Sequence, residues 1–307
     1  MGSPHLEGFA RTHADLLRTM DGCIWEAGYK DEADRPTISL GLKGILSIEL
    51  RAHTANTDAH PPGPRASGGL CPNAIWRLVD ALYTLRAPDG TVLVDGFLDP
   101  VRPPTAADMA LLEQWPFDAE VTDRERRMGM AGLLGGRTGM AALRRLVFEP
   151  TCTINGMVGG YTGPGSKTVI PARAMAKLDF RLVPDLTPEL ALTLVKAHLA
   201  RRGFDDVEVV EIEGGLMPAR TDPNAAIVAS VLGAMAEVYG VDPVIQPSMA
   251  GSGPMYQLCQ AYGIPAVSLG VGWSQSRVHA PNESVRIADF IQGIKVMGRV
   301  YGGFAVR

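Results

Sequence analysis

The stretch Ile264-Pro265-Ala266-Val267-Ser268-Leu269-Gly270 indicates the fold class. Its run of apolar and β-branched residues is typical of a buried, parallel strand. A loop rich in Gly, Ser and Trp follows, and it leads to His279-Ala280-Pro281-Asn282-Glu283. Open α/β sheets bind their ligands at the carboxyl ends of the strands, so His279 is predicted to lie at such an edge. An imidazole there can bind a metal, act as a base or make a structural hydrogen bond.

A second pattern occupies the middle of the chain. From Gly44 the residues alternate with period two, which predicts a half-buried strand. The patterns that follow predict a helix over 75–85, strands over 151–157 and 169–183, a helix over 187–199 and a strand over 207–213. In the longest strand the residues that alternate inward are Ala174, Ala176, Leu178, Phe180 and Leu182. The order β-α-β-β-α-β is that of a ferredoxin-like module.

The predicted fold class is therefore α/β, with this module interrupting an α/β layer made from both chain ends. We expect the layer in residues 1–43 and 216–307 and the module in 44–215, with an insertion over 88–150. Within the insertion, Thr105-Ala106-Ala107-Asp108 predicts a helix that starts with a capping box. The first 43 residues offer only one helix and one or two strands, so the layer is expected to be incomplete on that side.

Composition limits the class of partner. A chain of 307 residues can form two domains with a buried core. A net charge of -4 gives no support to a nucleic-acid or anionic-membrane partner, and no apolar run approaches the length of a membrane span. The four cysteines form no C-x-x-C pair, which argues against a zinc ribbon and favours the reduced thiols of a cytoplasmic protein.

Two ionisable residues follow predicted strand ends. Glu26 comes directly after the short strand at 23–25, and His279 follows the strand at 264–270. Two such side chains can converge on one pocket, and a carboxylate with an imidazole suits zinc. Two ligands are nevertheless too few for a tight site.

Other candidate motifs are weaker. Arg181 lies on an apolar strand, so it either faces solvent or binds a carboxylate. The turn Gly251-Ser252-Gly253-Pro254 is expected to open a helix, whose N–H groups can hold a substrate carboxylate. It does not fit the serine-hydrolase elbow. The glycine-rich run 159–168 is not a phosphate loop, because Ser166 separates the glycine from Lys167 and a strand follows.

Three ordered motifs carry a resemblance to a known family. They are Gly163-Pro164-Gly165-Ser166-Lys167-Thr168-Val169-Ile170-Pro171-Ala172, Lys177-Leu178-Asp179-Phe180-Arg181-Leu182-Val183-Pro184 and His279-Ala280-Pro281-Asn282-Glu283. The chain resembles the dinuclear-zinc metallopeptidases that include cytosolic nonspecific dipeptidase, carnosine dipeptidase, aminoacylase, glutamate carboxypeptidase and acetylornithine deacetylase. The dipeptidase branch is the most similar, and the likeness covers essentially the whole chain.

The resemblance implies a zinc-binding catalytic domain interrupted by a ferredoxin-like lid and dimerisation domain. It also implies two zinc ions per subunit, with manganese or cobalt as substitutes, and a homodimer formed through the lid. The implied reaction is hydrolysis of the amide bond of dipeptides or N-acyl amino acids by a zinc-bound water. We therefore expect a metallopeptidase of the dipeptidase or carboxypeptidase type.

The motifs of the family assign roles to individual residues by resemblance. Glu26 is similar to the carboxylate ligand of one zinc and His279 to the histidine ligand of the other. His60 resembles the lid histidine that polarises the scissile carbonyl in the partner subunit's site, although Pro61 follows it where the family usually has serine. The residues that match positions holding the C-terminal part of the substrate are Thr168, Arg181, Gly251 and Ser252.

One part of the family pattern is not found in residues 1–307. Family members carry a His-x-Asp ligand pair, a bridging aspartate and a Glu-Glu dipeptide upstream of the Gly-Ser that here is Gly2-Ser3. His5 and His13 match none of those ligands. We therefore expect a C-terminal portion with an incomplete site and impaired hydrolysis. The alternatives are a catalytically inactive protein that still dimerises or binds ligands, or one half of a split enzyme.

Overall fold

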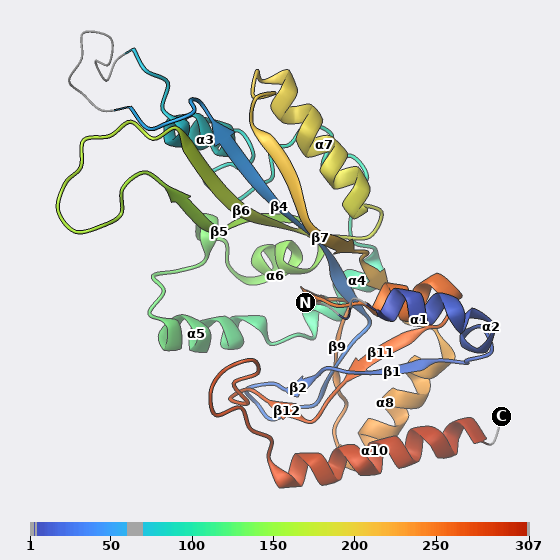
Figure 1. The fold of residues 1–307 in the computed structure, drawn as a ribbon. Coiled ribbons are helices and arrows are strands. Elements are labelled where there is room, and N and C mark those ends of the chain that lie inside the picture. Colours follow the sequence, from blue (N-terminus) through green and yellow to red (C-terminus); the bar gives the residue numbers. More distant parts are fainter. Residues whose placement is uncertain (1–2, 4, 60–69, 306–307) are drawn as a thin grey trace. The chain divides into compact units, whose positions relative to one another are not determined.

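The computed structural model describes residues 3, 5–59 and 70–305 (Figure 1). It divides into two compact units. The first comprises Met1–Lys43, Arg102–Phe148 and Met217–Arg307, and the second comprises Gly44–Val101 and Glu149–Leu216. The chain passes from the first to the second within strand β4 (Gly41–His53). Residues 102–148, part of the stretch expected to be an insertion, group with the first unit.

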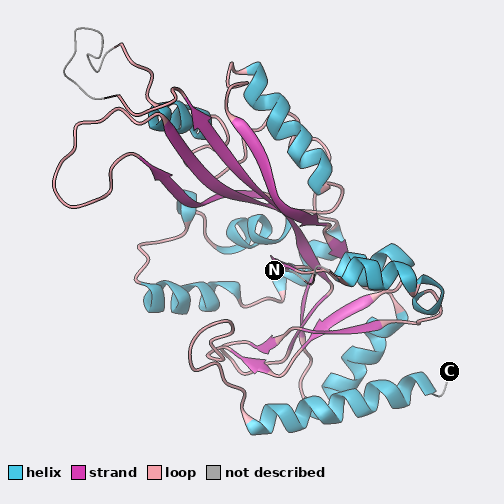
Figure 2. Cartoon of the chain, in the orientation of Figure 1, coloured by secondary structure: helices cyan, strands magenta, loops and turns pink. Residues whose placement is uncertain are grey.

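The second unit is built on a four-stranded antiparallel sheet (Figure 2). Its strands lie in the order β7-β4-β6-β5, and the further bounds are β5 (Thr151–Gly159), β6 (Arg173–Leu182) and β7 (Glu208–Leu216). Helix α3 (Ala74–Tyr83) connects β4 towards β5, and α7 (Pro188–Arg201) connects β6 to β7. The connection β-α-β-β-α-β is the predicted ferredoxin-like arrangement.

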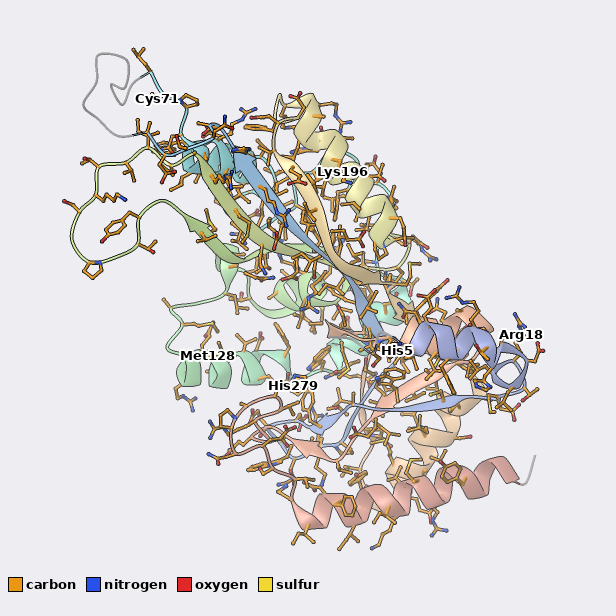
Figure 3. The ribbon with its side chains drawn as sticks, in the orientation of Figure 1. His5, Arg18, Cys71, Met128, Lys196 and His279 are labelled. Carbon is orange, nitrogen blue, oxygen red and sulfur yellow. The ribbon has the colours of Figure 1, made fainter. Side chains whose placement is uncertain are left out.

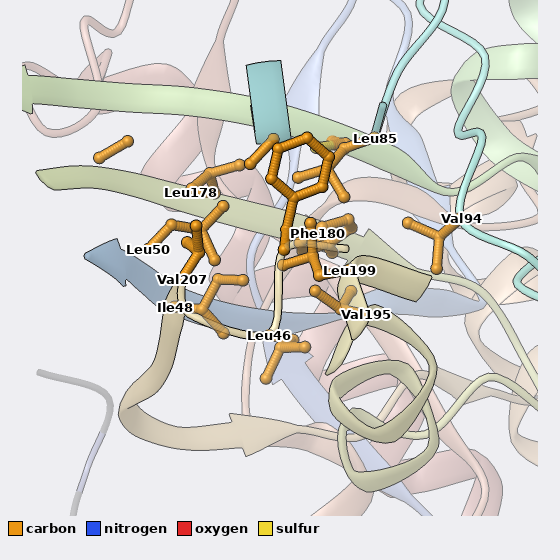
Figure 4. Close-up of a cluster of buried hydrophobic side chains, with 14 of the residues drawn as sticks. Leu46, Ile48, Leu50, Leu85, Val94, Leu178, Phe180, Val195, Leu199 and Val207 are labelled. Atoms are coloured by element: carbon orange, nitrogen blue, oxygen red, sulfur yellow. The ribbon is translucent and has the colours of Figure 1, made fainter. Parts of the chain in front are cut away.

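Period-two patterning explains the core of this unit. Leu46, Ile48 and Leu50 of β4 are fully buried beside Leu178 and Phe180 of β6 (Figure 4). The two helices pack their apolar stripes against the same face of the sheet, through Ala74, Leu78, Ala81, Ala191, Val195 and Leu199. The inward alternation predicted for β6 is confirmed. The strand is shorter than predicted, however, because it begins at Arg173, and Ile170 makes only an isolated bridge to Ala59.

The first unit contains a smaller mixed sheet in the order β1-β11-β3-β9. Its strands are β1 (Cys23–Glu26), β3 (Thr37–Ser39), β9 (Val244–Gln246) and β11 (Ala266–Leu269). The β1–β11 and β3–β9 pairs are parallel, whereas β11 and β3 are antiparallel. Beyond them, β2 (Tyr29–Lys30) pairs in parallel with β12 (Gly272–Trp273). The stretch quoted first thus contains the predicted buried strand, which is parallel to β1 as predicted but antiparallel to β3.

Helices cover both faces of this smaller sheet. Helices α8 (Ala226–Tyr239) and α10 (Ile287–Ala305) lie side by side (Figure 1). They share one apolar cluster with Val267 and Leu269 of β11. A second cluster joins Ala266 and Trp25 to residues of α9 (Met255–Leu258) and α2 (Ala14–Leu17). Further short elements on this side are α1 (Leu6–Thr12), the 3₁₀ turn η2 (Gln260–Tyr262) and β8 (Ala219–Arg220), which pairs with β4.

A third cluster in the first unit is formed by the helices of residues 102–148. They are α4 (Ala106–Glu113), α5 (Phe117–Met128), the 3₁₀ turn η1 (Leu134–Gly136) and α6 (Gly139–Phe148). The capping box predicted for α4 is confirmed, since the Asp108 N–H donates to Thr105 Oγ1 and the Thr105 N–H donates to Asp108. Within the described ranges, no helix is both long and apolar enough to span a membrane.

Candidate functional site

Two strands of the first unit end at the same edge of the sheet. In the parallel register of β1 and β11, Glu26 lies opposite Leu269, and the Ala27 N–H donates to the Leu269 carbonyl at 3.1 Å. The chain continues from both strands through glycines that approach closely. A Cβ added to Gly28 would lie 2.5 Å from the Gly270 nitrogen, so only glycine fits there. The predicted edge therefore forms, with Glu26 on one side of it.

The loop after β12 carries His279, whose exposed side chain is labelled in Figure 3. Ser276 fixes the base of this loop, because its hydroxyl accepts from the Trp273 N–H at 2.8 Å and its carbonyl accepts from the Ser284 N–H at 3.0 Å. His279 has φ of 62° and Asn282 has φ of 63°. Non-glycine residues in the left-handed region are uncommon and concentrate at functional sites.

A buried ion pair holds the start of α10 near this edge. Lys30 Nζ lies 2.8 Å from Asp289 Oδ1 and donates to Gln292 Oε1 at 2.9 Å. Burial raises the pKa of Asp289, but the hydrogen bonds from Lys30 and Arg286 lower it more, so the pKa stays below its ordinary value. These contacts tie β2 to α10, and α10 follows the His279 loop directly.

The donor set that the structure describes does not complete a metal site. Glu26 and His279 supply one carboxylate and one imidazole, which suit zinc. Among the described residues, however, no group of three or more His, Cys, Asp or Glu side chains can hold a metal ion. Two donors do not fit the four-coordinate sites that zinc forms in proteins. We therefore assign no catalytic step to a metal held by these residues alone.

The turn predicted at Gly251 takes a different form. Gly251 and Ser252 belong to the short strand β10 (Met249–Ser252), which pairs in parallel with β4 so that Ser252 lies opposite Lys43. The following helix α9 has only four residues and no side-chain cap. The helix predicted after this turn is present as α9, but Gly251 and Ser252 form the end of a strand instead of a turn because β10 pairs with β4. Gly251 is exposed and Ser252 is half-buried.

The second unit carries the remaining predicted residues. Thr168 is exposed on the loop between β5 and β6. Arg181, on β6, donates from Nε to Asp179 Oδ1 at 3.1 Å, and Asn155 donates to the other Asp179 oxygen at 2.8 Å. Arg181 thus faces a carboxylate of its own chain, which the sequence reasoning missed although residues two apart share a strand face. His60 lies outside the described residues.

A groove in the first unit was not predicted from the sequence. It has a volume of about 830 Å³ and is bordered by β1, the end of β11 and α10. The side chains that line it include Ile24, Glu26, Phe290, Ile294, Met297 and Tyr301. The signal was present, because the α10 sequence has apolar residues on more than one side of the helix.

The chain combines an α/β unit, in which the parallel strands β1 and β11 end at one edge, with a βαββαβ unit. Comparisons with known proteins identify its family. Residues 2–302 match the model of peptidase family M20/M25/M40. The chain therefore belongs to this family.

Solved structures and curated proteins agree with this assignment. The M20-family metallo-carboxypeptidase Sso-CP2 of Sulfolobus solfataricus is 35% identical with a TM-score of 0.87, over 96% of this chain and 66% of that one. The di-peptidase Dug1p of Saccharomyces cerevisiae is 25% identical with a TM-score of 0.78, over 97% and 62%. The Beta-Ala-His dipeptidase of Rattus norvegicus is 27% identical over 87% and 54%. The chain thus spans between about half and two thirds of the length of these relatives.

Proposed function

We propose that this chain forms part of a metal-dependent peptidase that hydrolyses the amide bond of dipeptides or N-acyl amino acids. The family match over residues 2–302 is the observation that carries the proposal. The names of the similar proteins, which are dipeptidases and a carboxypeptidase, support small peptides as the substrate class. The first unit also has the strand-end edge at which α/β proteins bind their ligands.

In this proposal Glu26 and His279 are zinc ligands. Both are exposed, so neither is committed to the core. The ordered base of the His279 loop and the close approach of Gly28 and Gly270 restrict where these ligands can move. Zinc bound in a completed site would supply Lewis-acid chemistry and a reactive water. The remaining ligands and the general base must come from other residues than these.

The resemblance also assigns residues to substrate binding, and each is described within its own unit. In the first unit, Gly251 and Ser252 of β10 offer backbone and hydroxyl groups that can bind a substrate. In the second unit, the exposed Thr168 offers a hydroxyl. Arg181, also in the second unit, is proposed to bind a substrate carboxylate through charge-assisted hydrogen bonds. Asp179 orients the Arg181 guanidinium by accepting from Nε. We retain His60 as the residue that polarises the scissile carbonyl, on the resemblance alone.

We further propose that the chain dimerises through the second unit. Strand β5 lies at the edge of the four-stranded sheet, where its outer peptide groups can pair with another strand. Three apolar side chains of β5 are exposed, namely Ile154, Met157 and Val158. Tyr83 at the end of α3 is also exposed. An apolar edge of this kind suits a symmetric contact between two copies.

An inactive, ligand-binding protein or one half of a split enzyme is the second candidate. The two-donor set among the described residues favours it. Loss of a general base removes a contribution of roughly 10²–10⁴-fold. We therefore expect residues 1–307 alone to hydrolyse dipeptides little or not at all.

The experiment compares two proteins on a panel of dipeptides and N-acyl amino acids with added zinc or manganese. One is the 307-residue chain, and the other is a chimera in which this chain is joined, in the order of the Sso-CP2 sequence, to the part of Sso-CP2 outside the aligned 66%. We expect turnover only by the chimera, lost in His279→Ala but retained in the surface control His5→Ala. A folded, metal-loaded chimera without turnover would contradict the peptidase proposal. If the 307-residue chain itself turned over a substrate and His279→Ala abolished that turnover, the expectation that this chain hydrolyses little or nothing would be contradicted.

A further inference from the structure

Two cysteines that are distant in sequence meet in the first unit. Cys23 is the first residue of β1, and Cys259 directly follows α9. Cys23 packs against the apolar cluster that contains Cys259 and Ala266 of β11. The Cys23 N–H donates to the Pro265 carbonyl at 2.9 Å, and the Ile264 N–H donates to the Cys259 carbonyl at 3.1 Å. The short segment that leads into β11 thus holds the backbones of both cysteines.

The side chains of the two cysteines are in contact. The Cys259 thiol donates a hydrogen bond to the Cys23 sulfur. This hydrogen bond outweighs the effect of burial and lowers the pKa of Cys23 to about 7. The same hydrogen bond, together with burial, raises the pKa of Cys259 above its ordinary value. At neutral pH a large fraction of Cys23 is therefore thiolate, whereas Cys259 keeps its proton.

The two sulfur atoms differ in their access to solvent. Cys23 is half-buried and lines the groove of about 830 Å³ beside β1, whereas Cys259 is only 1% exposed. A small oxidant in the groove therefore reaches Cys23 first. An accessible thiol of low pKa beside a second thiol is the arrangement of an attacking and a resolving cysteine in redox-sensitive proteins.

A disulfide between these cysteines requires a small movement. The two sulfur atoms must approach to about 2.05 Å. Cys23 lies at the start of β1, and Cys259 lies at the end of a helix of only four residues without a side-chain cap. The ends of helices and strands open more readily than their interiors. The movement therefore falls where the backbone adjusts most easily.

The other two cysteines of the chain provide internal references. Cys71 and Cys152 both lie in the second unit. Burial raises the pKa of Cys152 to about 12, so its thiol stays protonated at neutral pH. Cys71 is half-buried, as Cys23 is. Oxidation that followed exposure alone would therefore affect Cys71 as much as Cys23.

We propose that Cys23 and Cys259 form a redox-active dithiol, which a hydroperoxide entering the groove oxidises to a disulfide that ties β1 to the end of α9. The Cys23 thiolate attacks a peroxide oxygen and the O–O bond breaks. The departing oxygen takes a proton from solvent and leaves as water or an alcohol, while Cys23 becomes a sulfenic acid.

The second step forms the disulfide. The Cys259 sulfur attacks the Cys23 sulfur, the S–O bond breaks, and the hydroxyl group leaves as water with the proton of the Cys259 thiol. In total the two cysteines lose two electrons and the hydroperoxide gains them. A thiol reductant reverses the reaction by exchange with the disulfide. The proposal is independent of the proposed function, because none of these steps involves a metal or a peptide.

Thiol counting in the 307-residue chain tests the proposal. The reduced chain is treated with a small excess of hydrogen peroxide at neutral pH, unfolded, alkylated with N-ethylmaleimide and analysed by peptide mass spectrometry. We expect one disulfide-linked peptide that joins Cys23 to Cys259, while Cys71 and Cys152 remain alkylated. Dithiothreitol should restore both missing thiols. Oxidation of Cys23 to sulfinic acid without the link, a link between two copies of the chain, or equal oxidation of Cys71 would each overturn the proposal.

Three variants separate the roles of the cysteines. In Cys259→Ser the attacking thiol has no resolving partner, so Cys23 should accumulate as a sulfenic acid that dimedone labels. In Cys23→Ser the oxidation of Cys259 should slow at least about tenfold, because that thiol is buried and protonated. The matched control Cys152→Ser, which changes a buried cysteine of the second unit, should form the disulfide as the wild type does. Unchanged oxidation of Cys259 in Cys23→Ser would contradict the attacking role of Cys23.

Thermal unfolding gives a second readout that does not depend on the variants. A disulfide that closes the long loop between β1 and α9 should raise the melting temperature of the first unit by roughly 5–15 °C. Dithiothreitol should reverse the rise, and peroxide-treated Cys259→Ser should not show it. A wild-type chain that forms the disulfide without a rise in melting temperature would contradict the tie between β1 and α9.

Discussion

Lys30 Nζ lies 2.8 Å from Asp289 Oδ1, and the two side chains are only 10% and 3% exposed. Lys30→Met leaves the Asp289 carboxylate buried with one cationic partner fewer. We expect a loss of about 3–5 kcal/mol in the free energy of unfolding, measured by urea denaturation. The matched control is Arg299→Met, also on helix α10. It breaks an exposed ion pair with Glu237 of α8 and should cost less than about 1 kcal/mol. Equal losses in the two variants would contradict the role of burial.

The stability of the second unit should depend on His198 at mildly acidic pH. The Asp95 N–H donates to His198 Nδ1 at 3.1 Å, so the proton is on Nε2, which donates to the Thr84 carbonyl at 3.1 Å. Burial first, and then the charge of Arg202, lower the pKa of His198 below its ordinary value, although Asp95 opposes this. The folded state therefore favours the neutral ring.

Because the folded-state pKa of His198 is lowered, the folded state loses stability as the pH falls. The contribution of His198 is complete above the unfolded-state pKa of about 6.5 and is lost as the pH falls below it through the lowered folded-state pKa. Unfolding free energies measured between pH 7.5 and 5 should decline for the wild type. His198→Gln should be less stable by about 1–3 kcal/mol at pH 7.5 and show a flatter decline. His53→Gln, an exposed histidine of the same unit, should behave as wild type.

The close approach of Gly28 and Gly270 should not tolerate a side chain. A Cβ at Gly28 would meet the Gly270 nitrogen at 2.5 Å and the Leu269 carbonyl carbon at 2.8 Å, and both are backbone atoms. Gly28→Ala should therefore separate the segment after β1 from the end of β11 and cost about 1–3 kcal/mol. Gly298→Ala in α10 meets nothing within 4 Å and should stabilise by about 0.5–1 kcal/mol. Thermal unfolding of both variants checks the contrast, and a neutral Gly28→Ala would argue against a tight edge.

The β5 edge should govern self-association. Met157→Asp puts a charge on the exposed apolar edge and should raise the dimer dissociation constant at least about tenfold, as measured by sedimentation equilibrium, since a buried unpaired charge costs more than 1.4 kcal/mol. Leu190→Asp, on the exposed side of α7, should leave it unchanged. A wild-type chain that is monomeric at all concentrations would refute the proposed dimer.

Strong periodicity made much of the fold predictable. The alternation in β4 and β6, the Thr105 capping box and the apolar run before Leu269 are local patterns with a single physical interpretation, and each has its predicted structure. The helix after Pro254 is present as predicted, but Gly251 and Ser252 form a strand end and not a turn, because pairing with β4, which is distant in sequence, overrides the local turn preference. For the site, the strand-end position of Glu26 was visible in the sequence. The Arg181–Asp179 contact and the groove beside β1 depend on neighbouring chain segments that periodicity does not reveal.

Metal content per chain tests most directly whether residues 1–307 hold only part of a metal site. The purified chain is loaded with zinc, dialysed against metal-free buffer and analysed by atomic emission. Since the described residues offer no group of three or more donors, we predict well below one zinc per chain, and no difference between wild type and His279→Ala after dialysis. Close to two zinc ions per chain, lost in His279→Ala, would contradict this account and show that the 307 residues form a complete site.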